Sequence, residues 1–332
     1  MSALVGLLAD HSRAAAGTVF AGIVERFVAE KRPSGATGMN ALRVQGIVFS
    51  AGALLVALGT LALGRLSPQL ELIVVAVLIL VLGVPHGALD TIFAKELYGI
   101  RTLSGWLQFS LLYLLLAALV VGLWLWQPGL FLLGFLAISA AHFSGDPLQG
   151  VPWPARLFYG GSVILLPTIG HAQEIGRLFG LLVGDATATP LVPWLRLLAW
   201  PWLVGLALAS LWQTRHDFWT ALEMAAAGIL AIVAPPLVSF VVFFCGMHSA
   251  RHILRTMNFS GRSSWRYVAG AALLPMAGVL AGSTLAWVFL RDTALDARVV
   301  QVVFVGLAAL TVPHMVLVER VRLSGWIREK TP

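Results

Sequence analysis

Long apolar segments separated by short polar connectors dominate the pattern of this 332-residue chain. A helix that crosses a bilayer needs roughly 20 mostly apolar residues. Segments of this kind lie at 41–64, 69–93, 105–126, 129–145, 157–171, 190–212, 218–234, 235–257, 267–290 and 298–320. The seventh and eighth adjoin at Pro235-Pro236, and this proline pair predicts a turn or a break between two segments. The pattern predicts an all-α, polytopic integral membrane protein with about 8–10 transmembrane helices.

Composition supports a membrane protein. Hydrophobic residues make up 59% of the chain and charged residues only 11%, whereas soluble domains have about 25% charged residues. The net charge of +7 does not indicate a nucleic-acid partner, because the basic residues lie in short connectors where they determine topology. With a cytoplasmic N-terminus, most of the 22 Lys and Arg residues fall on the cytoplasmic side. The single cysteine, Cys245, excludes an intrachain disulfide.

Three regions are expected along the chain. Residues 1–40 lack the apolar core and cleavage site of a signal peptide, so they are interpreted as an N-terminal cytoplasmic extension. Residues 41–322 are expected to form a single helical transmembrane domain that carries the site. Residues 323–332 are expected to form a cytoplasmic C-terminal tail.

Five histidines stand near the ends of apolar segments that all run toward the cytoplasm: His86, His142, His248, His252 and His314. They should therefore share one depth, in the cytoplasmic half of the bilayer. His248 and His252 are four residues apart, a spacing that places both on one face of an α-helix. A lone intramembrane histidine more often forms a structural hydrogen bond between helices. Five at one depth predict instead a divalent metal with three or four imidazole ligands, although imidazole suits iron, copper, zinc and nickel alike.

Acidic and apolar residues flank these histidines. Asp90 follows His86 by four residues and Asp146 follows His142 by four, so each carboxylate is expected to share a helical face with its histidine and accept its far N–H. The alternative, that the carboxylates cap helix ends, has equal weight for Asp146. The residues expected to line a slot for a long apolar substrate, with plain helix packing as the alternative, are Phe143, Phe243, Phe244, Met247 and Met315. The histidines outside this set are His11, His171 and His216.

Four motifs carry a resemblance to a known family. They are PHGALD at 85–90, HF at 142–143, HSARH at 248–252 following Phe244-Cys245, and TVPHM at 311–315. In this order, over about 80–325, the sequence resembles the Brp/Blh family of bacterial and archaeal membrane proteins, the β-carotene 15,15′-dioxygenases. One departure is the Ser144-Gly145-Asp146 segment, where the family has glycine directly after the phenylalanine.

The resemblance implies an enzyme that uses Fe2+ and O2 to cleave the central double bond of β-carotene into two molecules of retinal. It implies His86, His142, His248 and His252 as iron ligands and catalytic residues, and His314 as a fifth ligand or a contact of the substrate. It further implies a bacterial inner membrane and a rhodopsin that receives the retinal. Two other classes stay open: a haem b electron carrier, which would need histidine pairs at two depths, and a transporter with a histidine relay.

Overall fold

Helices joined by short connectors account for the fold. The computed structural model describes residues 35–64, 67–148, 150–260 and 264–321, and no β-strand lies within these ranges. The first elements are α2 (Gly35–Leu63), α3 (Pro68–Leu78), the π-helical segment η1 (Ile79–Gly83), α4 (Pro85–Ala88), α5 (Asp90–Tyr98), α6 (Leu103–Trp126), α7 (Pro128–Phe143) and α8 (Trp153–Leu165). The remaining elements are α9 (Pro167–Val183), α10 (Asp185–Ala188), α11 (Leu191–Gln213), α12 (Phe218–Val233), α13 (Pro236–Val241), the π-helical η2 (Val242–Ser249), α14 (Ala250–Ser260), α15 (Trp265–Phe289) and α16 (Leu295–Val321).

Seven helical stretches in the described ranges are long and apolar enough to cross a membrane: Asn40–Leu63, Pro68–Tyr98, Leu103–Trp126, Asp185–Gln213, Pro236–Ser260, Trp265–Phe289 and Leu295–Glu319. Two shorter apolar helices, α7 and α12, have 16 residues each. At 1.5 Å per residue each is about 24 Å long, slightly less than the hydrocarbon core of a bilayer. The chain is therefore a multi-pass α-helical membrane protein, as its pattern predicts.

The structure differs from the predicted span at 157–171. The helix α8 ends at Leu165, α9 begins at Pro167, and the backbone of His171 is non-helical, with φ −136° and ψ 35°. Proline has no N–H for the helical ladder, so it starts a new helix here. Tight packing also holds α8 in place, because a Cβ added to Gly160 would lie 2.3 Å from the carbonyl oxygen of Ala140 in α7. The predicted single span is thus a bent pair of helices.

Prolines mark the starts of several helices, as their fixed φ favours. They begin α3 at Pro68, α7 at Pro128, α9 at Pro167 and α13 at Pro236. The predicted break at Pro235-Pro236 is confirmed, because Ala234 and Pro235 are extended between α12 and α13. The chain then continues through η2 into α14.

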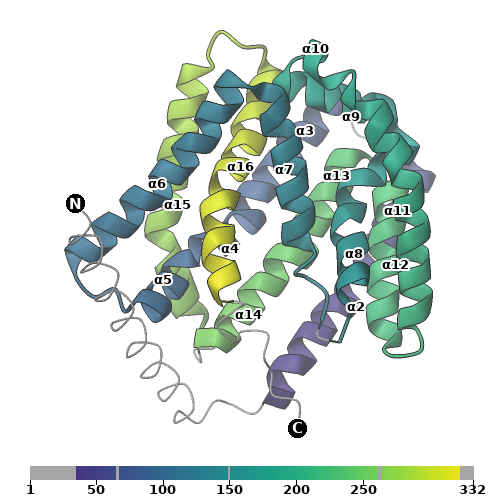
Figure 1. The fold of residues 1–332 in the computed structure, drawn as a ribbon, viewed down its shortest axis with the longest axis horizontal. Helices are drawn as coiled ribbons and strands as arrows, with labels where there is room; N and C mark the ends of the chain where they lie inside the picture. The colour runs from purple at the N-terminus through teal and green to yellow at the C-terminus, as the bar shows by residue number, and fades with distance from the viewer. Residues whose placement is uncertain (1–34, 65–66, 149, 261–263, 322–332) are drawn as a thin grey trace, which may run out of the picture. The chain divides into compact units, whose positions relative to one another are not determined.

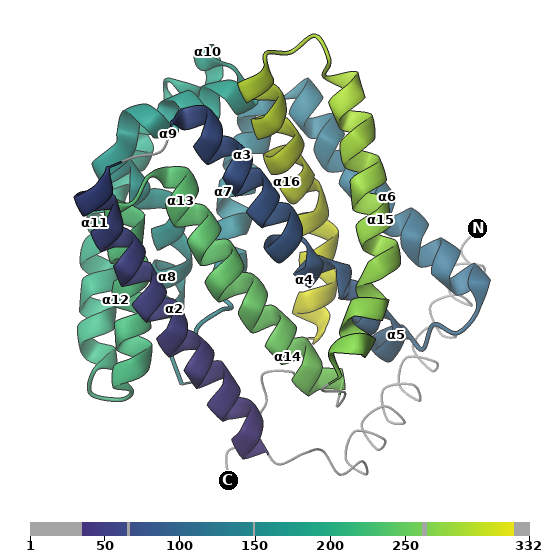
Figure 2. The ribbon, with the colours of Figure 1, turned by 180° about the vertical axis from the view of Figure 1, so that it is seen from behind.

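The helix α16 lies among the elements that carry the histidines. Figure 1 shows it beside α6 and α7, and Figure 2 shows it from behind, between α3 and α15. Across from it, the two π-helical segments η1 and η2 pack against each other. Five histidines on α4, α7, η2, α14 and α16 are thereby brought to one region of the fold.

The predicted terminal regions fall largely outside the described residues. Of the predicted extension at 1–40, only the start of α2 is described, and the tail at 323–332 is not described. His11 also lies outside the described residues.

Candidate metal centre

The structure brings all five predicted histidines into one cluster. The ring centroid of His86 lies 4.9 Å from that of His248, 5.3 Å from that of His252 and 5.3 Å from that of His314. The ring of His142 lies 4.4 Å from His248 and 5.1 Å from His314. Four of the rings are buried, and His142 is half-buried. Separate helices thus supply the imidazoles, and ligand atoms of three of them, His86, His142 and His314, lie within 4.8 Å of one another.

His86 is fixed by the π-helical segment that precedes it. Its Nδ1 lies 2.5 Å from the carbonyl oxygen of Gly83 and 2.9 Å from Oγ of Ser249. Because a carbonyl only accepts, Nδ1 carries the proton and the lone pair lies on Nε2. Close packing of η1 on η2 makes this possible, since a Cβ on Gly83 would lie 2.5 Å from the ring of Phe244.

Two further histidines are held by carboxylates in the same way. Nδ1 of His248 donates to Asp146, 3.0 Å from each carboxylate oxygen, and Nδ1 of His314 donates to Oδ1 of Asp90 at 2.7 Å. In the described part of the chain, Nε2 of His248 and Nε2 of His314 are buried and have no hydrogen-bond partner. A buried nitrogen lone pair without a partner is costly, and a metal ion would satisfy it.

The predicted pairing of carboxylates with histidines is wrong. Sequence spacing pairs Asp90 with His86 and Asp146 with His142, with a helix cap as the alternative for Asp146, but Asp90 accepts from His314 and Asp146 from His248. The helical register breaks at Leu89, whose ψ of −2° ends α4, so Asp90 begins a new helix. Similarly, α7 ends at Phe143, which leaves Asp146 in the connector beyond it. Each carboxylate thus reaches across to another element.

The local helix geometry around His248 also differs from the one that the sequence spacing predicts. Residues Val242–Ser249 are π-helical, so His248 and His252 do not sit on two consecutive turns of a regular α-helix. Their ring centroids are 6.4 Å apart. π-Helical turns widen a helix and occur often at functional sites. Gly83 and Gly246 lie within η1 and η2, but sequence periodicity does not distinguish a π-helical turn from an α-helical one.

Three polar residues around the cluster were not predicted. The hydroxyl of Tyr113 donates to Oδ2 of Asp90 at 3.0 Å, so Asp90 joins α6 to α16. Arg251 and Glu223 form a fully buried ion pair with an N–O distance of 2.6 Å. Ionisable side chains are rare within membrane segments, so the Glu223 carboxylate in an apolar segment was a usable signal.

A cavity of about 1750 Å³ lies beside the cluster, and its wall includes His86, Asp90, His142 and His314. Mostly apolar side chains of α3, α6, α7, α15 and α16 form the rest of the wall. Sites for drug-sized ligands are typically about 300–1,000 Å³, so this one has room for a larger apolar molecule.

The predicted slot residues divide into two groups. Phe143 and Phe244 line the cavity. Phe243, Met247 and Met315 are not among the described residues that line it, and Phe243 and Met247 are buried in the core instead. The side chain of Met247 lies toward α2, where Nε2 of Gln45 is 3.6 Å from its Sδ.

The two other described histidines lie apart from the cluster. His171 marks the bend in α9, where its Nε2 is 3.3 Å from the carbonyl oxygen of Val233. His216 is exposed in the connector after α11 and stacks on Trp212. Both were excluded from the predicted site.

Fold and site together define a class: a multi-pass membrane protein with a buried imidazole cluster beside a large apolar cavity. Comparison with known proteins identifies the family. Residues 77–321 match the family of β-carotene 15,15′-dioxygenases, so the chain belongs to this family.

Two relatives illustrate the match. The β-carotene 15,15′-dioxygenase of an uncultured marine bacterium, 66A03, is 33% identical over 255 residues, covering 73% of this chain and 90% of the relative. The probable β-carotene 15,15′-dioxygenase Blh of Halobacterium salinarum is 27% identical over 292 residues, covering 76% and 85%. No solved structure matches the chain.

Proposed function

We propose that this chain is an Fe2+-dependent dioxygenase that cleaves the central double bond of β-carotene with O2 and releases two molecules of retinal. The observation that carries the proposal is the imidazole cluster in the wall of an apolar cavity. The names of the relatives supply the substrate and the bond that is cleaved.

The residues present fit a resident metal ion. Ligand atoms of His86, His142 and His314 lie within 4.8 Å of one another, and buried Nε2 atoms of His248 and His314 lack other partners among the described residues. The proposed ligands are His86, His142, His248, His252 and His314. Bound Fe2+ would supply the activation of O2, which does not react with an alkene unaided. The nitrogen donors do not select iron over copper or zinc, so iron rests on the family.

The cavity would hold and orient the polyene. It extends along α6 from Leu103 to Leu125, nearly the whole of a 24-residue helix, or about 36 Å. Tyr113, which contacts Asp90 of the cluster, lies near the middle of that run. An elongated substrate could therefore lie with its centre beside the imidazoles and its two ends toward Leu103 and Leu125 of α6. The position of the substrate in the cavity would then determine which double bond is cleaved.

The proposed reaction balances without a further reductant. The carbon–carbon double bond breaks, each carbon gains one oxygen atom of O2, and two aldehydes form. Apolar walls exclude water from the site and accept a substrate that dissolves in lipid.

Membrane location and partner are part of the proposal. The proposed location is the cell (inner) membrane, and the distribution of Lys and Arg supports an orientation with both termini cytoplasmic. Retinal leaving the cavity into lipid could pass to a rhodopsin in the same membrane. A carrier of two haems would need imidazole pairs at two depths, whereas here five rings share one cluster.

The test uses bacterial cells that accumulate β-carotene. Cells that express the chain should turn pale and contain retinal, and cells with His248→Ala should stay orange. His216→Ala is the matched control, because this histidine is exposed and outside the cluster. Unchanged carotene in cells that hold folded, iron-loaded wild-type protein would contradict the proposal.

A further inference from the structure

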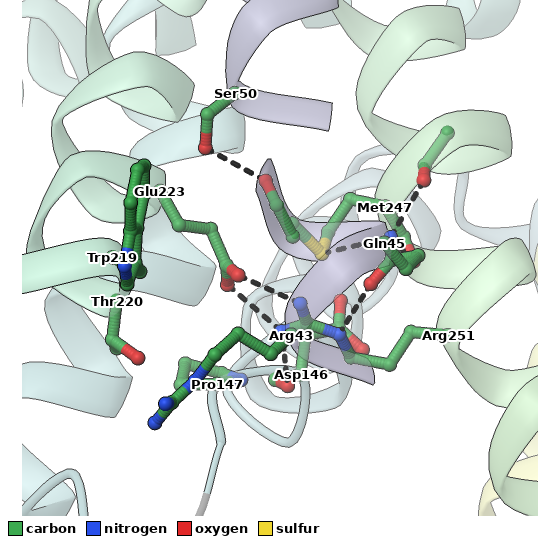
Figure 3. Close-up of polar contacts among 12 residues, drawn as sticks. Arg43, Gln45, Ser50, Asp146, Pro147, Trp219, Thr220, Glu223, Met247 and Arg251 are labelled. Atoms are coloured by element: carbon green, nitrogen blue, oxygen red, sulfur yellow. Dashed lines mark hydrogen bonds and ion pairs between the residues drawn. The ribbon is translucent and has the colours of Figure 1, made fainter. Parts of the chain in front are cut away.

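Arg251 is a buried cation that the proposed reaction does not use. It precedes His252 on α14, and its side chain is fully buried. Its guanidinium makes four hydrogen bonds to three residues, and Figure 3 shows it pointing between Glu223, Gln45 and Asp146. A side chain with this many partners is fixed in one orientation.

Two of these partners tie α14 to other helices. Glu223 of α12 receives two hydrogen bonds from Arg251, one from Nη1 at 2.8 Å and one from Nη2 at 2.6 Å. Gln45 of α2 accepts from Nε at 2.8 Å and donates in turn to the carbonyl oxygen of Gly246 in η2. Gly46 permits the approach, since a Cβ there would lie 2.5 Å from Oε2 of Glu223 and 2.9 Å from Nη2 of Arg251.

The third partner is the connector that holds the carboxylate of the metal centre. Nη1 of Arg251 donates to the carbonyl oxygen of Asp146 at 3.0 Å. One turn later, Arg255 donates to the carbonyl oxygens of Gly145 at 2.9 Å, Asp146 at 2.9 Å and Pro147 at 3.3 Å. Two arginines of one helix thus fix the backbone of a connector whose Asp146 side chain holds Nδ1 of His248.

We propose that Arg251 is a positioning residue for the metal centre. It holds the backbone of Asp146 so that the carboxylate keeps Nε2 of His248 directed at the other imidazoles, and Arg255 supports the same connector. The inference rests on the proposed function, since it concerns the ion that the imidazoles would bind. It gives a role to the arginine of the HSARH motif, which the imidazole chemistry leaves without one.

A purely structural role can be separated from this one. Removing Arg251 alone leaves Glu223 charged and unpaired in the interior, which destabilises any fold. Replacing both partners of a buried ion pair by apolar side chains is often neutral for stability. The double variant Arg251→Met with Glu223→Leu therefore removes the hydrogen bond to Asp146 without leaving a lone charge.

The experiment measures Fe2+ affinity by chelator competition on the purified protein, together with its melting temperature. The double variant should melt near the wild-type temperature and bind Fe2+ about 10- to 100-fold more weakly, the usual effect of losing a residue that supports a ligand. Asp146→Asn should show a loss of the same size. Arg255→Met keeps the ion pair between Arg251 and Glu223 intact and should show a smaller loss of Fe2+ affinity. It is the second test, to be used if the double variant does not fold.

Arg43→Met is the matched control. Arg43 is exposed and pairs at 3.1 Å with Asp217, the N-cap residue of α12, and among the described residues it makes no hydrogen bond to Asp146, so its loss should leave Fe2+ affinity unchanged. The visible spectrum of the Co2+-loaded protein should change in the double variant and not in the control. A folded double variant, or a folded Arg255→Met, with wild-type affinity would overturn the positioning role alone. Wild-type protein that binds no Fe2+ would overturn the proposed function and this inference with it.

Discussion

At the scale of single residues, three imidazoles of the cluster are oriented in the same way. His86, His248 and His314 each have Nδ1 bound to an oxygen acceptor, which leaves Nε2 as the available donor to a metal. The sequence identified the histidines because a neutral imidazole in an apolar segment is conspicuous. It could not identify the acceptors, because the partner of Asp90 is 224 residues away and depends on how two helices cross.

His314 is the residue whose role the sequence left open. Its Nδ1 is bound to Asp90 just as Nδ1 of His248 is bound to Asp146, so we expect it to be a ligand. His314→Ala should lower bound iron at least 10-fold, as His248→Ala should, because each removes one donor from the same ion. Metal analysis of the purified variants measures this, with His216→Ala as control. Full iron content with lost turnover would instead make His314 a contact of the substrate.

At the scale of elements, the contact between η1 and η2 positions two of the imidazoles. Gly83 allows the ring of Phe244 to pack directly on the backbone of η1. Sequence periodicity predicts regular helices here, and it gives no indication of a π-helical turn, whose formation depends on packing between two segments.

Gly83→Ala tests this contact. The added methyl group would lie 2.5 Å from the Phe244 ring, so we expect a loss of about 1–3 kcal/mol in stability from overpacking and a weaker metal site. Gly52→Ala in α2 is the control, because no atom lies within 4 Å of a Cβ there. Thermal unfolding and iron content give the result. Equal melting temperatures for the two variants would show that the close contact is not needed.

The helix α15 lines the cavity with small residues. Gly278 and Gly282 face it, and a Cβ at either position would have no atom within 4 Å. The space beside these two glycines is therefore not filled by neighbouring side chains.

Gly278→Phe should fill part of the cavity. We expect a folded protein with near-normal iron content and at least a 10-fold lower kcat/KM for β-carotene, because the substrate can no longer place its centre at the cluster. Gly122→Phe is the matched control, since Gly122 lies on an exposed face of α6 away from the cavity. Unchanged kinetics in Gly278→Phe would place the substrate elsewhere.

At the scale of the whole molecule, the bilayer explains why the fold was largely predictable. Length and apolar composition fix a membrane helix, so the predicted segment 105–126 corresponds to α6 at Leu103–Trp126. The predicted span at 157–171 was wrong, because Pro167 starts a new helix there and the backbone bends again at His171. Hydropathy indicates which segments cross the membrane, but not which face of each one meets its neighbours.

The most direct test of the proposed function measures retinal formed from β-carotene and O2 by the purified protein while Fe2+ is titrated into the metal-free form. We expect no retinal without iron, a rise in retinal formation that ends at one iron per chain, and two retinals for each β-carotene consumed. We expect no rise for His248→Ala. Retinal formation that is independent of iron, or a protein that binds iron and leaves β-carotene intact, would contradict the proposed function.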